Sequence, residues 1–491
     1  MSGNGADMGD KKGIKMTDKT WAARLAGAAL AAGLAWGAMS GATAQTATPA
    51  AGAPASSSPA ASAPAAAGAP ATPAAPHNSN AKPDSGDTAW MLTSTALVLL
   101  MTIPGLALFY GGMVRRKNVI ATVAQSFAIC CVVTLVWYVA SYSIAFGTNV
   151  DAGQNKYWGG LGKALLRGVT MDKPFQIAGA DVTIPEYVYM MFQMTFAIIT
   201  PALIAGAFAE RFKFSALLLF TVLWSLFVYA PIAHWVWGGG FLGGATPPVL
   251  DFAGGTVVHI NAGVAGLVCA LVLGPRKGYG RDNMAPHNLV YTMIGASLLW
   301  VGWFGFNAGS AVGSNALAGV AMANTQIATA AAAIAWMIAE WLERKKPGML
   351  GLASGAVAGL VAVTPASGFV NPMGALIIGL IAGVGCFLAA VYLKRLFKYD
   401  DSLDAFGVHG IGGLIGALLT GVFADAAINP AGKVHSLYTQ AIGCVATIAW
   451  TAVATFLILM VCRFTTGLRV SEEGETEGLD AALHGEALHE Y

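Results

Sequence analysis

The chain has 491 residues, of which 56% are hydrophobic and 11% are charged, and its formal net charge at neutral pH is +2. Charged residues make up about a quarter of a typical soluble protein, so this chain has too few to cover a water-facing surface. The composition predicts a membrane protein, and the small net charge argues against a nucleic-acid partner.

The first 44 residues have the layout of a secretory signal peptide. Lysines and Arg24 precede an apolar stretch from Leu25 to Met39, and Ala42-Thr43-Ala44 then offers a small-x-small cleavage site. The alternative is an uncleaved first anchor helix. Because the apolar stretch is short and rich in alanine and glycine, the signal peptide is favoured.

Residues 45–86 are predicted to be a disordered linker. From Thr46 to Pro76 the chain contains only Ala, Pro, Ser, Thr and Gly. Such a segment has little to bury and should remain unfolded. We expect a transmembrane domain over residues 87–465 and a cytoplasmic C-terminal tail over residues 466–491.

From about Asp87 the sequence becomes a series of apolar stretches. Each is close to the roughly 20 residues that a helix needs to cross a bilayer. The sequence therefore predicts an all-α membrane protein with eleven transmembrane helices. Their approximate bounds are 88–113, 119–146, 186–209, 215–237, 252–273, 289–308, 325–342, 349–366, 372–393, 404–424 and 437–462.

Lysine and arginine residues predict the orientation of these spans. If the first span begins outside, the inner loops and the tail hold sixteen basic residues, and the outer segments after residue 44 hold six. Cytoplasmic loops carry such an excess. We expect a multi-pass membrane protein, with its N-terminus outside and its C-terminus in the cytoplasm.

Eleven spans can be divided into two inverted five-helix repeats plus one extra helix, an arrangement known in transporters. Each predicted half ends in a span that opens with an aspartate and contains a histidine: Asp251 with His259, and Asp404 with His409. The two spacings are eight and five residues. The symmetry is therefore incomplete.

His259 and His409 are the first candidates for function. An ionisable residue at bilayer depth is costly and by default marks a functional site. Either histidine alone could be a core residue bonded to a backbone carbonyl. Two of them in corresponding spans favour a pair that shares a pore, where neutral imidazoles could relay a proton or guide a small polar solute.

Other candidate residues lie near the predicted outer face. Asp251 could cap its helix, organise a cation site electrostatically, or do both. Tryptophans at a membrane interface are commonly anchors, but a Trp face beside a hydroxyl also suits a small cation. Phenylalanines below such a site would block hydrated ions. The residues in question are Phe192, Phe196, Trp237, Trp303, Phe306 and Ser310.

Several motifs resemble those of the ammonium transporter family (Amt/Mep/Rh), specifically its bacterial Amt branch. The most specific are DFAGGTVVHIN and FGVHG; AERFKFSALLLF, PIAHWVWGGG, GWFGFNAGS and GLVAVTPASGFV agree with them. The resemblance runs from about Asp87 to the C-terminus. It implies a homotrimer with one pore per subunit and eleven transmembrane helices, the first ten forming an inverted repeat.

The resemblance also implies residue roles. Trp237, Phe196 and Ser310 correspond to an outer ammonium recruitment site, and Phe196 with Phe306 to a stacked phenyl gate. His259 and His409 correspond to the twin histidines of the pore, and Asp251 to the buried aspartate that supports the outer site. Phe192 and Trp303 correspond to further vestibule aromatics. The implied mechanism is recruitment of ammonium, deprotonation near the gate and passage of ammonia past the histidines.

The tail resembles a cytoplasmic region that, in this family, lies where a PII-type signal protein can bind. The acidic run at residues 472–477 could equally be a solvated tail. Two alternatives to a transporter remain, an ammonium sensor of the same fold and an Rh-type channel for neutral gas. No motif predicts an enzyme, a cofactor or a metal site.

Overall fold

The computed structural model describes residues 82–178 and 180–488. The predicted signal peptide and the linker up to residue 81 lie outside the described residues. Within the described part, ten helical segments are long and apolar enough to cross a membrane. A further apolar helix, α12 (Met349–Val363), is shorter and coincides with the predicted span 349–366. The predicted fold class is confirmed, and the count of eleven crossings stays a prediction.

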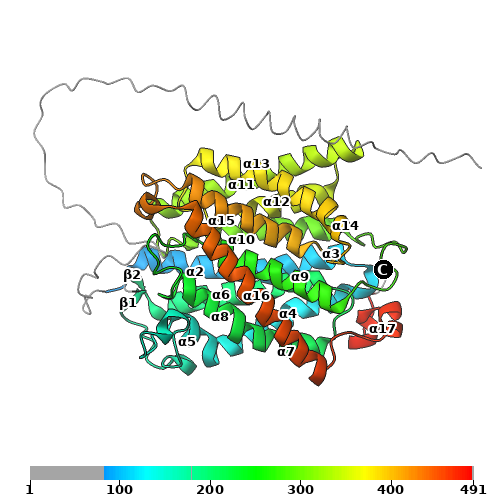
Figure 1. The fold of residues 1–491 in the computed structure, drawn as a ribbon, viewed down its shortest axis with the longest axis horizontal. Helices are drawn as coiled ribbons and strands as arrows, with labels where there is room; N and C mark the ends of the chain where they lie inside the picture. Colours follow the sequence, from blue (N-terminus) through cyan, green and yellow to red (C-terminus); the bar gives the residue numbers. More distant parts are fainter. Residues whose placement is uncertain (1–81, 179, 489–491) are drawn as a thin grey trace, which may run out of the picture. The chain divides into compact units, whose positions relative to one another are not determined.

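The helices lie side by side in a bundle (Figure 1). In chain order the α-helices of the bundle are α2 (Ser85–Leu100), α3 (Ala107–Met113), α4 (Val119–Val136), α5 (Tyr142–Phe146), α6 (Glu186–Phe208), α7 (Phe214–Trp224), α8 (Ala230–Val236), α9 (Asn261–Leu273), α10 (Leu289–Gly309), α11 (Ala316–Arg344), α12, α13 (Pro372–Leu388), α14 (Lys394–Phe397), α15 (Ile411–Phe423) and α16 (Leu437–Thr465).

The two ends of the bundle carry different small elements (Figure 1). One end has the antiparallel hairpin of β1 (Pro174–Ile177) and β2 (Ala180–Pro185), and we call it the hairpin end. The other end has α17 (Glu472–Glu477) and α18 (Leu479–His484), and we call it the tail end. The hairpin lies in a segment for which the sequence predicted no regular structure.

One predicted boundary was too late. Helix α11 begins at Ala316 instead of near residue 325, because Asn315 caps it by accepting a 3.0 Å hydrogen bond from the backbone N–H of Ala318. Asparagine is among the preferred N-caps, and the alanines that follow are strong helix formers. Hydropathy alone did not reveal this first part of the helix.

Six helices contain a π-helical turn, the wider turn that often occurs at functional sites. The turns are η1 (Met101–Leu106), η3 (Trp137–Ser141), η6 (Ser225–Tyr229), η7 (Gly255–Ile260), η8 (Ala389–Leu393) and η9 (Phe406–Gly410). His259 lies in η7 and His409 lies in η9. Both candidate histidines therefore occur where the regular helical hydrogen bonding is interrupted.

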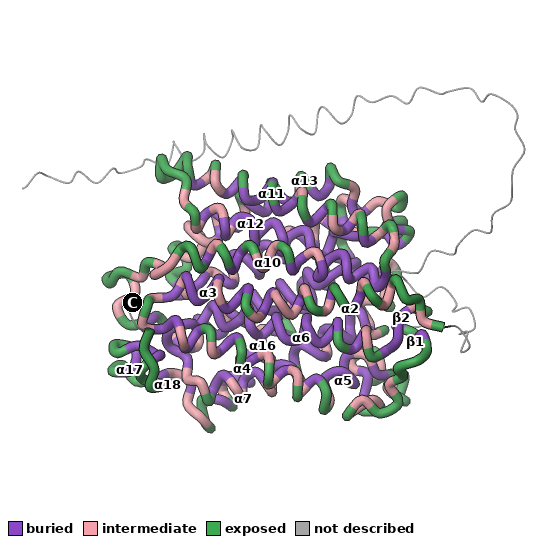
Figure 2. The backbone as a smooth tube through the Cα atoms, turned by 180° about the vertical axis from the view of Figure 1, so that it is seen from behind, coloured by how far each residue is buried: buried purple, intermediate pink, exposed green. Residues whose placement is uncertain are grey.

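Burial identifies the helices that surround the core. Helix α6 is buried almost along its whole length, whereas α16 is the least buried of the long helices. Figure 2 shows the buried segments following the inner helices and exposed turns alternating along outer ones such as α13. The elements that carry the candidate residues, α6, η7, α10 and η9, all lie against this core.

A buried charge network joins four connections at the tail end. The guanidinium of Arg276 lies 2.9 Å from Glu210 and 2.8 Å from Asp400, and Arg115 lies 3.0 Å from Glu210. Burial alone would raise the pKa of both carboxyl groups, but the arginines outweigh it and hold each pKa below its usual value. The network thus ties together the ends of several helices.

We expect Arg276→Gln to lower the free energy of unfolding by roughly 3–5 kcal/mol at neutral pH, because two buried carboxylates lose their shared cation. Carboxyl groups with lowered pKa values stabilise the fold above their usual pKa, and this contribution is lost as the pH falls. The defect should therefore shrink towards pH 4. Thermal unfolding of the purified protein at both pH values measures it.

Arg281→Gln is the matched control, since Arg281 is exposed in the same connection between α9 and α10. Equal losses in the two variants, or a larger Arg276 defect at acidic pH, would contradict this account of the network.

Candidate functional site

Asp251 fixes the start of the turn that carries His259. Its carboxylate accepts hydrogen bonds of 2.6–3.2 Å from the backbone N–H groups of residues 254–257, and a further one from the Thr256 hydroxyl. The side chain is buried, and these donors satisfy N–H groups that a helix start leaves free. Asp251 is therefore the helix cap that the sequence predicted. Its support for a cation site stays a prediction.

The equivalent aspartate in the second half is Asp401, and the prediction of Asp404 was wrong. Asp401 accepts hydrogen bonds from the backbone N–H groups of Ala405 (3.1 Å) and Phe406 (2.7 Å), whereas Asp404 pairs with Lys394 at 2.8 Å. Burial and the neighbouring Asp404 raise the pKa of Asp401 to about 6.

The correction makes the two halves more alike. Asp251 precedes His259 by eight residues, and Asp401 precedes His409 by the same number. The two capped turns enter the bundle from opposite ends, η7 from beside Trp237 at the hairpin end and η9 from the charge network at the tail end. This arrangement is what two inverted repeats require.

Glycines allow the two histidine-bearing segments to cross closely. A Cβ atom on Gly263 would lie 2.2 Å from the backbone nitrogen of Gly410, and one on Gly413 would lie 2.9 Å from the Cβ of His259. Small residues at such crossings let membrane helices approach each other's backbones. The crossing is the reason why two histidines 150 positions apart in sequence become neighbours.

His259 and His409 face each other inside the bundle. Their Nδ1 atoms are 3.4 Å apart, their ring planes differ by 20°, and both side chains are buried. The contact is slightly longer than most N–H hydrogen bonds. His259 Nε2 has no hydrogen-bond partner among the described residues. The structure thus brings the two predicted histidines together.

A continuous series of ring contacts leads from the hairpin end to this pair. Trp237 contacts Phe196 edge-on with ring centroids 6.0 Å apart, and Phe196 stacks on Phe306 at 4.1 Å. Phe306 is then 6.0 Å from His259, whose ring centroid is 5.4 Å from that of His409. We call these five residues the ring series.

Two further predicted aromatics flank the ring series. Phe192 contacts Phe196 at 4.9 Å, and Trp303 lies against His259 at 5.4 Å with its ring plane tilted by 21°. The indole N–H of Trp303 donates a 2.8 Å hydrogen bond to the hydroxyl of Thr364. This bond fixes the indole, so that its face remains against the His259 ring.

A small cavity lies beside the Trp237 end of the ring series. Its volume is about 10 Å³, close to the roughly 10–15 Å³ needed to hold one water molecule. We call it the Ser310 cavity; its lining residues are Phe192, Gln193, Trp237, Phe252, Ser310 and Val312. The Ser310 hydroxyl donates to the backbone carbonyl of Phe306 (2.8 Å), so its oxygen can still accept a hydrogen bond.

Comparison with known proteins identifies the family. The model of the Ammonium Transporter Family matches residues 89–489. An ammonium transporter from Aquifex aeolicus is 51% identical over 416 residues, covering 84% of this chain and 95% of the relative. One from Bacillus subtilis is 49% identical over 414 residues, covering 82% and 98%. The chain belongs to the Ammonium Transporter Family.

Solved structures agree with this assignment. The crystal structure of Saccharomyces cerevisiae Mep2 matches with a TM-score of 0.72 and 33% identity, covering 79% of this chain and 88% of that one. A sensor Amt protein matches with a TM-score of 0.74 and 28% identity, covering 81% and 98%. This ammonium transporter family protein is accordingly a membrane protein and not an enzyme.

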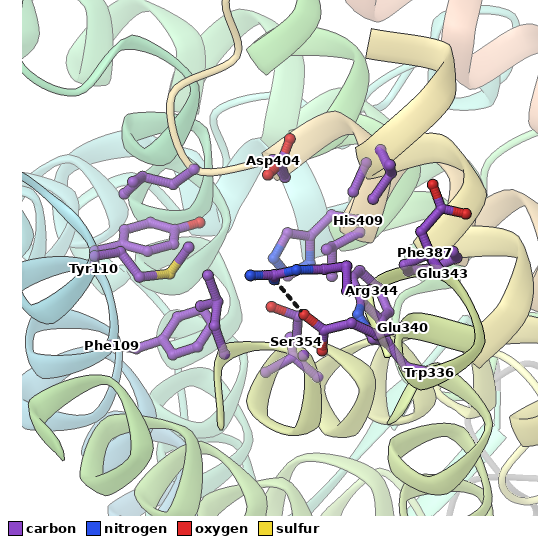
Figure 3. Close-up of a pocket in the computed structure, with 18 of the residues that line it drawn as sticks. Phe109, Tyr110, Trp336, Glu340, Glu343, Arg344, Ser354, Phe387, Asp404 and His409 are labelled. Carbon is purple, nitrogen blue, oxygen red and sulfur yellow. Dashed lines mark hydrogen bonds and ion pairs between the residues drawn. The ribbon is translucent and has the colours of Figure 1, made fainter. Parts of the chain in front are cut away.

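At the tail end the ring series opens into a larger cavity of about 340 Å³, which we call the vestibule (Figure 3). His409 is on its wall, with Ser354 and Tyr110 among the other lining residues. Charged groups surround it: Arg344 extends into the space and pairs with Glu340 at 2.6 Å, and Asp404 and Glu343 lie nearby.

All nine site residues predicted from the sequence lie in or directly beside the ring series and the Ser310 cavity. Sequence reasoning missed Asp401, Thr364 and Gln193. An equal spacing of eight residues before each histidine would have identified Asp401. Among residues 82–178 and 180–488, no group of His, Cys, Asp or Glu is arranged to hold a metal ion.

We expect Gly263→Ala to destabilise this family member by about 1–3 kcal/mol, because the added methyl group would collide with the backbone of Gly410 and force α9 and η9 apart. Thermal unfolding measures the loss. Gly319→Ala is the control: a Cβ there meets nothing within 4 Å, so the helix-favouring alanine should be neutral or stabilising. Similar behaviour of the two variants would refute the importance of the crossing.

Proposed function

We propose that this protein is an ammonium transporter that takes up ammonium at the hairpin end and conducts ammonia, with or without the proton, to the tail end. The observation that carries the proposal is the unbroken ring series from Trp237 to His409, with a one-molecule cavity at its start and a wide vestibule at its finish.

Recruitment would take place in the Ser310 cavity. An ammonium ion there meets the aromatic side chains of Trp237 and Phe192, which attract a cation, and the Ser310 oxygen, which can accept one of its N–H groups; Phe196 lies next to Trp237 as the next ring of the series. The Asp251 carboxylate is buried behind Trp237, whose indole N–H donates to the Asp251 carbonyl at 2.8 Å. Both carboxylate oxygens already hold N–H groups, so Asp251 would act through its charge and not as the proton acceptor.

The stacked pair of Phe196 and Phe306 would select what proceeds. Ring centroids 4.1 Å apart leave no room for a hydrated ion, and an unpaired charge in such an apolar environment is very costly. Ammonium can lose its proton and continue as neutral ammonia. Potassium is of similar size but has no proton to lose, so it should be excluded.

The histidine pair would provide one donor and one acceptor beyond the gate. If the two Nδ1 atoms share one proton, the ring that donates has a bare Nε2 and the ring that accepts has an Nε2–H. A neutral pair therefore presents both a lone pair and an N–H along the path. It can pass a polar molecule along, or relay a proton by exchanging tautomers.

The cellular setting follows from charge and composition. With the hairpin end outside, the basic connections lie in the cytoplasm, as bacterial inner-membrane proteins prefer. We propose this orientation, with the tail in the cytoplasm. We also propose a homotrimer, for which the many exposed apolar side chains on α10, α11 and α13 leave ample helix surface.

The tail is folded onto the bundle, which bears on its proposed partner. Asp480 accepts hydrogen bonds from the backbone N–H groups of Ile120 (3.2 Å) and Ala121 (2.8 Å) at the start of α4. Glu475 is buried beside Arg469, so the acidic run is not simply a solvated tail. We propose that this folded surface, at the same end of the bundle as the vestibule, helps to bind a PII-type signal protein.

Two other functions of the same fold compete with transport. The similarity to a structure described as a sensor Amt protein favours the sensor as second candidate. A sensor would bind ammonium without sustained current. An Rh-type channel for neutral gas would pass ammonia without any current on adding ammonium.

We expect the wild-type protein, reconstituted in a solid-supported membrane, to give a saturable current with ammonium and none with potassium. His259→Ala or His409→Ala should reduce the ammonium current about tenfold or more, or allow potassium to pass, because the donor–acceptor pair beyond the gate is lost. Electrophysiology with the two ions in turn measures both effects.

His435→Ala is the matched control, since His435 lies on the connection between α15 and α16, outside the ring series. Selective current of normal size in both pore variants would refute a role for the pair. Absence of current in the wild type would refute transport itself.

We expect deletion of residues 466–491 to weaken binding of a PII-type protein or to change the ammonium current, because the deletion removes the folded tail surface at the vestibule's end of the bundle. Binding to the immobilised transporter and current are both measured. Glu472→Gln, at an exposed tail position, is the control. Unchanged binding and unchanged current after the deletion would mean that the tail serves neither purpose.

A further inference from the structure

The side-chain amide of Gln440, on α16, is engaged by two different segments. Its Oε1 accepts a 2.7 Å hydrogen bond from the backbone N–H of Leu250, and its Nε2 donates to the carbonyls of Leu250 (2.8 Å) and Ala417 (2.9 Å). The side chain is buried. If the amide were reversed, its NH₂ group would face the N–H of Leu250 and its oxygen would face the two carbonyls. These three contacts therefore fix the orientation of the amide.

These two segments belong to opposite halves of the candidate site. Leu250 directly precedes Asp251, which caps the His259 turn and receives the indole N–H of Trp237. Ala417 lies in α15, eight residues after His409. One side chain from the extra helix therefore links the segment leading into the His259 turn to the helix that continues from His409.

Glycines bring α16 close enough for this contact. A Cβ atom on Gly443 would lie 2.9 Å from a methyl carbon of Val249, and one on Gly421 would lie 2.8 Å from the Cγ of Gln440. Without these small residues the helix would stand further away, and the amide would not reach both segments.

Other contacts hold α16 in place independently of Gln440. The Thr451 hydroxyl donates to the side-chain oxygen of Asn261 at 2.8 Å, and the indole N–H of Trp224 donates to Thr455 at 3.1 Å. Loss of the Gln440 amide should thus leave the helix bound. It would deprive the N–H and carbonyl of Leu250 of the side-chain partner that they have among residues 82–178 and 180–488, and let the segment before Asp251 shift.

We propose that Gln440 is a positioning residue for ammonium recognition, which holds the Asp251 segment, and through it Trp237, in register with the His409 helix. The inference rests on the transport function proposed above. Gln440 does not touch the Ser310 cavity or the ring series; it acts through Leu250 and Asp251. In this role, α16 would help to align the site in addition to covering the two repeats.

The test is Gln440→Met, which keeps the length of the side chain and removes its hydrogen bonds. The half-saturating ammonium concentration should rise about threefold to thirtyfold, which is the range expected for a residue that acts on a site through its neighbours. The maximal current should change less. Currents are normalised to the amount of folded protein. Gln125→Met is the matched control, since Gln125 is equally buried on α4, away from these segments.

A double-mutant cycle separates positioning from mere stability. If Gln440 acts through Trp237, then Gln440→Met should add little to the increase in half-saturating concentration caused by Trp237→Phe, whereas Gln125→Met combined with Trp237→Phe should be additive. Gly443→Ala provides a second route, because its methyl group pushes against Val249 while leaving Gln440 intact. It should raise the half-saturating concentration in the same direction.

The outcomes are distinct. An unchanged half-saturating concentration in both Gln440→Met and Gly443→Ala would overturn the proposal while transport stands. Additive effects of Gln440→Met and Trp237→Phe would also overturn it. Loss of saturable current in the wild type would instead overturn the transport function on which the proposal rests.

Discussion

The contact between the Nδ1 atoms of His259 and His409 is the geometry on which the candidate site depends. This contact joins the two halves of the chain inside the bundle. It can form only if the two helix starts, which enter from opposite ends, cross so closely that their backbones approach each other. The glycines at the crossing, the two aspartate caps and the π-helical turns that carry the histidines all contribute to this close crossing. Each would be costly elsewhere: glycine weakens a helix, a buried carboxylate loses hydration, and a π-turn gives up regular hydrogen bonds.

The two ends of the path differ in a way that fits a directional task. The Ser310 cavity is about as large as one small molecule and is bordered by aromatic faces, whereas the vestibule is far wider and bordered by charged side chains. A narrow aromatic cavity discriminates among cations by contact with each face. In a wide polar vestibule, a solute that leaves the ring series can become hydrated. In the proposed function, the phenyl pair between them would separate recognition from release, so that selectivity and exit need not be met by the same groups.

Much of this site could be predicted from the sequence because its residues stand out chemically. A histidine within an apolar span is unusual, and the motifs around His259 and His409 are specific to one family.

Asp401 was missed because two aspartates precede Asp404 in the same short segment, and only the backbone conformation decides which carboxylate reaches the free N–H groups. The hairpin β1–β2 and the first turns of α11 were missed for a related reason: hydropathy registers lipid contact, and neither segment depends on it. The roles of Gln193 and Thr364 could not be predicted, because a polar residue in a helix acquires its role from neighbours that are distant in sequence.

The position of α16 raises a general point about inverted repeats. Two halves related by such symmetry could slide or tilt against each other if no specific contacts joined them, and the histidine crossing and the Arg276–Asp400 ion pair already limit this freedom. A helix outside both repeats can remove this freedom only if it touches both, and most of α16 presents apolar side chains that cannot specify register. Polar contacts can, because a hydrogen bond is lost with a shift of about 1 Å. The amide of Gln440 makes such contacts to both halves at the end where a cation would enter, and Thr451 adds another within the bundle to the helix that carries His259. If Gln440 has the role proposed above, the last predicted span, α16, is the element that keeps the two similar halves aligned along the proposed path.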